Sequence, residues 1–289
     1  MVRGLRRPDL TGDAHLPGKL DRPKASQSQG EETELAKTKA FEQKHYLLEV
    51  RLRREEIDSF ADYPFCLAAV RHLTTLTLHP AVTFIIGENG TGKSTLLEAI
   101  AIAYGFNPEG GSRNFNFATR SSHSSLHKFL RLSRGIRRAR DGFFLRAESF
   151  YNVATEIERL DADASGAPRI VDSYGGSSLH EQSHGESFMS LVTHRFRGHG
   201  LYLLDEPEAA LSPTRQMALI TRIHDLVVDH SQFIIATHSP IIMAYPDAKI
   251  FHLSDRGIEE VAYTDTEHYR VSRSFLMKHE HMLRILMEK

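Results

Sequence analysis

The segment of residues 87–94 constrains this chain more than any other. It consists of Gly87, Glu88, Asn89, Gly90, Thr91, Gly92, Lys93 and Ser94, and Thr95 follows. An apolar run, residues 81–86, precedes it, and residues 93–104 place apolar side chains at helical spacing. A strand, a glycine-rich turn and a helix form the context in which successive backbone N–H groups bind phosphate. The segment therefore predicts a P-loop that binds ATP.

Two carboxylates complete the chemistry that a P-loop needs. Residues 201–204 are apolar and end in Asp205 and Glu206, which predicts a strand with both carboxylates at the edge of a sheet. Lys93 is expected to reach the β- and γ-phosphates, and the Ser94 hydroxyl to bind Mg²⁺. Asp205 is expected to hold Mg²⁺ through water, and Glu206 to polarise the attacking water.

The order of predicted strands and helices favours an α/β fold with a mainly parallel sheet flanked by helices. Alternating side chains over residues 46–53 predict an N-terminal antiparallel part, and residues 267–288 predict a C-terminal helix with an apolar stripe. Residues 1–40 are rich in Pro, Gly, Ser and charge, so we expect a disordered extension. Residues 41–289 are expected to form the ATPase domain, with a helical lobe over approximately residues 105–195.

Composition narrows the class of protein. The 289 residues carry a formal net charge of −1, so global charge does not indicate an acidic partner. The single cysteine, Cys66, excludes a disulfide framework. The sequence has neither an apolar run of bilayer length nor the apolar stretch of a signal peptide, and a cytoplasmic location is expected.

Three further segments resemble the ABC-type ATPases. Residues 205–212 resemble the Walker B segment and D-loop, and residues 237–240, around His238, resemble the switch-histidine loop. Residues 183–187 resemble the signature motif, usually Leu-Ser-Gly-Gly-Gln. The segment keeps the serine and the second glycine, and it has substitutions at Gln182, His184 and Glu186. With the P-loop, these motifs follow the family's order over residues 87–240. Within the family, the chain looks most similar to the stand-alone soluble ATPases labelled AAA family, which are related to the SMC and DNA-repair branch.

The resemblance implies a homodimer that closes head to tail around two ATP molecules. Ser183, Gly185 and Glu186 would then contact the ATP that is held by the P-loop of the other subunit. His238 would sense the γ-phosphate. An alternative interpretation of Ser183 and Glu186 is an ordinary capping box at a helix N-terminus, and both interpretations can hold together.

Two positions of the family pattern stay open. Where the family has a glutamine that touches Mg²⁺, this chain has Glu148, which would serve as a carboxylate ligand or would cap the next helix as a surface residue. Tyr63 and Phe65 precede the P-loop at a distance that suits an aromatic ring stacked on adenine. Either ring can instead belong to the core.

The biological role has alternatives that the sequence does not separate. A basic run, residues 128–140, is typical of a solvated face, and it also suits a nucleic-acid backbone, as in an ATPase of DNA repair or anti-phage defence. The ATP-binding subunit of a membrane transporter is a further alternative, which the departures in the signature disfavour. An SMC-like tether is disfavoured because too few residues separate Lys93 from Ser183 for a long coiled coil.

Overall fold

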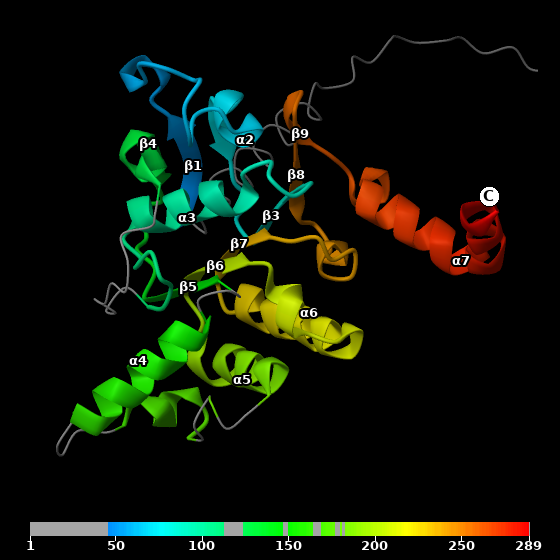
Figure 1. Ribbon diagram of the computed structural model, residues 1–289. Helices are drawn as coiled ribbons and strands as arrows, with labels where there is room; N and C mark the ends of the chain where they lie inside the picture. The colour runs from blue at the N-terminus through cyan, green and yellow to red at the C-terminus, as the bar shows by residue number, and fades with distance from the viewer. Residues whose placement is uncertain are drawn as a thin grey trace, which may run out of the picture. The chain divides into compact units, whose positions relative to one another are not determined.

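A six-stranded sheet lies at the centre of the computed structural model (Figure 1). The structure describes residues 46–112, 124–146, 150–163, 169–176, 180 and 183–288, so the expected N-terminal extension lies outside the described residues. In order across the sheet, the strands are β5 (Asp141–Arg146), β6 (Gly200–Asp205), β7 (Gln232–Ala236), β3 (Val82–Gly87), β8 (Lys249–Ser254) and β9 (Gly257–Glu260). Neighbouring strands pair parallel except β8 and β9. The α/β class and the mainly parallel sheet that we predicted are confirmed.

A second, antiparallel sheet has the order β2 (Thr75–Thr77), β1 (Leu47–Leu52) and β4 (Leu130–Arg134). β1 confirms the predicted N-terminal strand, whereas β4 falls in a stretch that we predicted to be loop-rich and part of the helical lobe. Leu130 is buried while Arg131 opposite Arg51 is exposed, so β4 has the alternation of a strand, but over only five residues. Within residues 105–195, the stretch that forms β4 and β5 therefore belongs to the sheets.

Helices cover both faces of the parallel sheet (Figure 1). They are α2 (Ala68–Arg71), α3 (Lys93–Tyr104), α4 (Phe150–Asp163), α5 (His184–Ser190) and α6 (Pro213–Val228), and a further helix, α7 (Glu267–Met287), follows the sheet near the C-terminus. One core cluster joins α3 and the antiparallel sheet to strand residues such as Ile85 and Ile234. The other joins α4, α5 and α6 to the strand residues that alternate with them, such as Phe84 and Phe233. The P-loop helix α3 and the signature helix α5 thus lie on opposite faces of the sheet.

Short helical turns connect these elements. They are η1 (Arg54–Glu56), η2 (Ser125–Phe129), η3 (Ile170–Tyr174), η4 (Leu191–Arg195), η5 (Pro207–Ala210), η6 (Ile242–Ala244) and η7 (Tyr263–Asp265). Helix α5 continues directly into η4, which is a π-helical turn.

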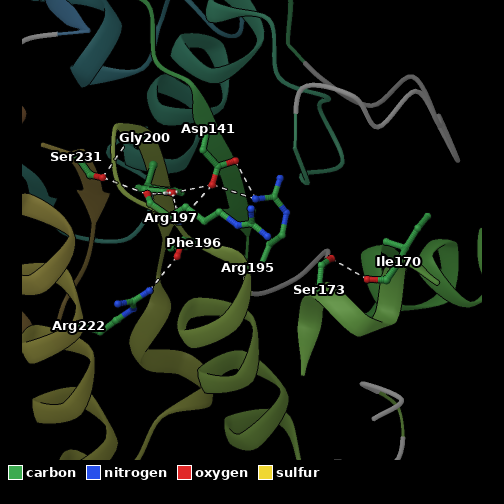
Figure 2. A network of polar contacts seen from close by, with 10 residues as sticks. Asp141, Ile170, Ser173, Arg195, Phe196, Arg197, Gly200, Arg222 and Ser231 are labelled. Carbon is green, nitrogen blue, oxygen red and sulfur yellow. Dashed lines mark hydrogen bonds and ion pairs between the residues drawn. The ribbon is translucent and has the colours of Figure 1, made fainter. Parts of the chain in front are cut away.

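A polar network fixes η4 to the start of β5 (Figure 2). Arg195 donates to both carboxylate oxygens of Asp141, at 2.8 and 2.9 Å, and the Tyr202 hydroxyl donates to the same carboxylate at 2.9 Å. Burial raises the pKa of the Tyr202 phenol, so that it remains a donor. Arg222 of α6 donates to the carbonyl of Phe196 at 2.9 Å. These contacts hold η4 and α6 at the edge of the sheet where β5 begins.

The C-terminal helix α7 confirms the predicted helix, and its apolar stripe is not buried in the domain. None of its residues is buried, and Leu276 and Leu286 are more than 70% exposed. The backbone of Lys278 leaves helical geometry, which kinks the helix. The first turn of α7 contacts the rest of the domain, as described below.

Candidate nucleotide-binding site

The P-loop connects β3 to α3, as predicted. Gly87, Gly90 and Gly92 all have positive φ angles, of 148°, 82° and 96°. At Gly87, a Cβ atom would lie 2.3 Å from the carbonyl oxygen of Leu253 in β8, so a side chain there would collide with the neighbouring strand. The loop can curl only because glycine occupies these positions.

Lys93 is held inside the P-loop. Its side chain is buried, and Nζ donates to the carbonyl oxygens of Gly87 and Glu88, both at 2.9 Å. Burial lowers the pKa of Lys93, while the carboxylates of Glu206 and Asp205 act in the opposite direction. The ammonium group therefore lies where the loop would enclose phosphate.

Ser94 and Asp205 meet at the ends of α3 and β6. The Ser94 hydroxyl donates to Oδ1 of the buried Asp205 at 3.0 Å. Hydroxyl and carboxylate oxygens are the ligands that Mg²⁺ prefers, so this pair fits the ion. Within the part of the chain that the structure describes, no group of three or more His, Cys, Asp or Glu side chains could hold a metal ion. Mg²⁺ at this place would take further ligands from phosphate oxygens and water.

Glu206 and His238 face each other across the ends of β6 and β7. Oε1 of Glu206 lies 3.7 Å from Nε2 of His238, and Glu206 has the left-handed φ of 50°. Nε2 of His238 is buried and has no hydrogen-bond partner among the described residues. Burial and then the charge of Lys93 lower the pKa of His238, so the imidazole is neutral near pH 7. An unpaired buried nitrogen beside the P-loop fits a phosphate oxygen as its missing partner.

Two residues of this edge were not predicted. Glu208 accepts from the Thr237 hydroxyl at 2.7 Å and from the backbone N–H of His238 at 2.5 Å, which fixes the switch-histidine loop. Arg146, at the end of β5, pairs with Glu98 of α3 and has Nε 3.9 Å from Oδ2 of Asp205. No local pattern marks either contact. Glu148, the expected Mg²⁺ ligand, lies outside the described residues.

A pocket of about 180 Å³ opens at the P-loop. Its lining consists of Leu67, Asn89, Gly90, Gly92, Lys93, Ser94, Thr95 and Glu206. Neither candidate for adenine stacking belongs to it. Tyr63 is 64% exposed, and Phe65 packs edge-on against Phe129, with ring centroids 5.0 Å apart.

The signature residues lie at the start of α5. Ser183 and Glu186 form the expected capping box: Oε2 of Glu186 accepts from the backbone N–H of Ser183 at 3.1 Å and from its hydroxyl at 2.7 Å. These bonds lower the pKa of Glu186. Gly185 is buried, and a Cβ atom there would lie 2.7 Å from the carbonyl oxygen of Ala210. Ser183 and Glu186 are exposed and are therefore free to contact a partner.

The basic run does not lie on the lobe helices. Arg131 and Arg134 belong to β4, and Arg137 and Arg138 follow it, exposed. Arg134 donates to the carbonyl of Tyr104 at 3.2 Å and lies over its ring, so part of the charge is used within the domain. Contact with nucleic acid stays a prediction.

Two family models match the chain and overlap. One, described as "AAA domain", matches residues 51–138, and the other, described as "AAA domain, putative AbiEii toxin, Type IV TA system", matches residues 112–244. Their joint range contains the P-loop, the signature residues and the carboxylates of β6. Both models describe AAA domains, which supports a P-loop ATPase domain in this chain. No curated protein matches the chain.

Solved structures are similar to this chain at low identity. The SMC head domain from Thermotoga maritima has 16% identity and a TM-score of 0.39 over 75% of this chain and 98% of that one. The structure of cbiO1 from Clostridium perfringens, part of the ABC transporter complex cbiONQ, has 17% identity and a TM-score of 0.45 over 83% and 99%. A nucleotide-free ATP-binding cassette from an ABC transporter has 16% identity and a TM-score of 0.45 over 79% and 95%. No role is carried over from these proteins.

Hydropathy adds one observation. Of the helices in the described ranges, none is both long enough and apolar enough to cross a membrane.

Proposed function

We propose that the protein binds ATP with Mg²⁺ and hydrolyses it in a head-to-tail homodimer that encloses two ATP molecules. One observation carries this proposal: the ends of β3, β6 and β7 bring a buried lysine, a hydroxyl–carboxylate pair and a glutamate–histidine pair to one edge of the sheet. In doubly wound sheets, ligands bind at the edge where parallel strands end.

Each side chain has a task in this proposal. The P-loop N–H groups and Lys93 bind the phosphates, and Ser94, Asp205 and Glu148 supply oxygen ligands to Mg²⁺. When bound, Mg²⁺ would neutralise charge on the phosphate oxygens. Glu206 accepts a proton from the attacking water while the water oxygen bonds to the γ-phosphorus. The bond from that phosphorus to the β–γ bridging oxygen breaks, and ADP leaves.

The position of the signature supports the dimer. Because α3 and α5 lie on opposite faces of the sheet, Ser183 and Gly185 are separated from the P-loop of their own chain by the sheet. A second subunit, turned head to tail, would bring its α5 N-terminus over that P-loop, with exposed Ser183 facing the γ-phosphate.

Replacement of the base tests the activity. In Glu206→Gln, we expect the kcat of ATP hydrolysis to fall about 100-fold or more, because the amide cannot accept the proton of water. ATP binding, followed with a fluorescent analogue, should persist. Glu280→Gln, an exposed change on α7, is the control and should hydrolyse ATP as the wild type does. A wild-type protein without turnover would contradict the proposed activity, and full turnover in Glu206→Gln would contradict the role of Glu206.

A further inference from the structure

The first turn of α7 brings a second histidine to the candidate site. Nε2 of His268 lies 3.2 Å from Nδ1 of His238, within hydrogen-bond distance, and the two ring centroids are 5.4 Å apart. His238 comes from the loop after β7, and His268 comes from the C-terminal helix. Nothing in the ABC-type motifs of this sequence points to His268.

The junction before α7 holds His268 in this place. Thr266 caps the helix: it is buried, its hydroxyl accepts from the N–H of Tyr269 at 3.3 Å, and it donates to the carbonyl of Tyr263 at 2.8 Å. Tyr263 in turn donates through its hydroxyl to the carbonyl of Pro240, at 2.8 Å, in the switch-histidine loop. The start of α7 is thus tied to that loop at two points, Pro240 and His238.

This contact borders a cavity beside the P-loop. The cavity has a volume of about 540 Å³, and Glu88, Asn89, His238, Glu267 and His268 are among its lining residues. Glu88 and Asn89 belong to the P-loop itself. The histidine pair therefore lies where the outer end of the bound triphosphate would be.

The hydrogen bond between the rings restricts where His238 carries its proton. A neutral imidazole has one N–H donor and one bare nitrogen acceptor. Burial lowers the pKa of both histidines, so both rings are neutral near pH 7. Either His268 donates through Nε2–H, which leaves the proton of His238 on Nε2, or His238 donates through Nδ1–H, which leaves its Nε2 bare.

The surroundings of His238 decide between the two arrangements. Its buried Nε2 faces Oε1 of Glu206 at 3.7 Å. A bare nitrogen would set one acceptor against a carboxylate, whereas an N–H group there is attracted to the carboxylate. A γ-phosphate oxygen, also an acceptor, requires the same N–H group. The arrangement in which His268 donates is therefore the favoured one.

We propose that His268 is a positioning residue for His238: by donating through Nε2–H to Nδ1 of His238, it keeps the proton of His238 on Nε2, aimed at Glu206 and the γ-phosphate. This inference rests on the proposed ATPase function. It makes the first turn of the C-terminal helix part of the hydrolytic site, with His268 acting through His238.

Two substitutions separate positioning from packing. His268→Ala removes the donor, and we expect kcat to fall about tenfold, the effect of one hydrogen bond, with the KM for ATP within about twofold. His268→Gln places an amide N–H near the former Nε2 and should keep kcat within about threefold of wild type. His279→Ala, an exposed histidine of the same helix, is the control and should change neither constant.

The outcomes are distinct from those that test the ATPase activity. Wild-type turnover is measured first, because its absence would contradict the proposed function rather than the role of His268. Given turnover, equal losses in His268→Ala and His268→Gln, or no loss in either, would overturn the positioning role. Nitrogen-15 NMR of histidine-labelled protein gives a readout without turnover, with His238 signals assigned from their loss in His238→Gln. A wild-type His238 protonated on Nδ1 would overturn the proposal.

Discussion

At the scale of single residues, Gly87 serves both the sheet and the P-loop. It ends β3, and its missing side chain lets the Leu253 carbonyl of β8 approach. Gly90, three residues on, also has a positive φ, but a Cβ atom there would meet nothing within 4 Å. A side chain at Gly87 would thus meet both a steric clash and an unfavourable φ, whereas a side chain at Gly90 would meet only the unfavourable φ.

This pair yields a stability prediction. Gly87→Ala should lower the free energy of unfolding by about 3 kcal/mol, because the Cβ collides with backbone that cannot move aside. Gly90→Ala should cost about 1 kcal/mol, the conformational penalty alone, and should mainly weaken nucleotide binding. Urea denaturation of both variants measures the difference. Equal losses would mean that β8 yields to the new methyl group.

Local patterns reveal only part of the candidate site. Lys93, Ser94, Asp205, Glu206 and His238 each stand in a motif beside a predicted strand, so they could be predicted from the sequence. Arg146, Glu208 and His268 could not. Their contacts depend on how distant segments meet: the Glu98–Arg146 pair, for example, spans 48 positions.

At the scale of elements, α3 is fixed to β5 by an ion pair as well as by its apolar face. The Arg146 guanidinium binds Glu98, whose side chain is only 10% exposed. Helix periodicity predicted α3, but it gave no reason to expect an ion pair at Glu98, which lies among the apolar residues of the helix. β4 was missed because its alternation is short. The apolar stripe of α7 is not buried, because periodicity does not show what a helix packs against.

The ion pair gives the prediction at this scale. Arg146→Met should lower the free energy of unfolding by about 3 kcal/mol, because it leaves the Glu98 carboxylate buried without its cation. The double variant Glu98→Gln/Arg146→Met should lose less, since both charges are gone. Arg159→Met breaks the Glu156–Arg159 pair on α4, in which the arginine side chain is 59% exposed, and it should cost under about 1 kcal/mol. Chemical denaturation compares them, and the prediction is wrong if Arg146→Met costs no more than Arg159→Met.

At the scale of the whole molecule, the parallel sheet separates the two halves of the proposed hydrolytic site. The mainly parallel sheet could be expected from strands alternating with helices, but the strand order and the division of helices between the faces depend on the crossover connections. That division puts α3 on one side and α5 on the other. In the proposed dimer, the P-loop of each chain is therefore completed by the signature residues of the other chain.

If the two halves of each site come from different chains, two inactive variants can complement each other. Lys93→Ala destroys a subunit's own P-loop, and Ser183→Arg destroys only what the subunit gives to its mate, so each variant alone should be inactive. When the two inactive variants are mixed, ATPase activity should return. In a hybrid dimer, the intact P-loop of the Ser183→Arg subunit meets the intact signature of the Lys93→Ala subunit, which makes one complete site. With free exchange of subunits, about a quarter of the wild-type ATPase rate should return. The double variant Lys93→Ala/Ser183→Arg mixed with Lys93→Ala should restore nothing. If the first mixture stays inactive, each chain uses its own signature with its own P-loop. If ATPase activity returns, the unit of inheritance is one chain, whereas the unit of activity is a pair of chains.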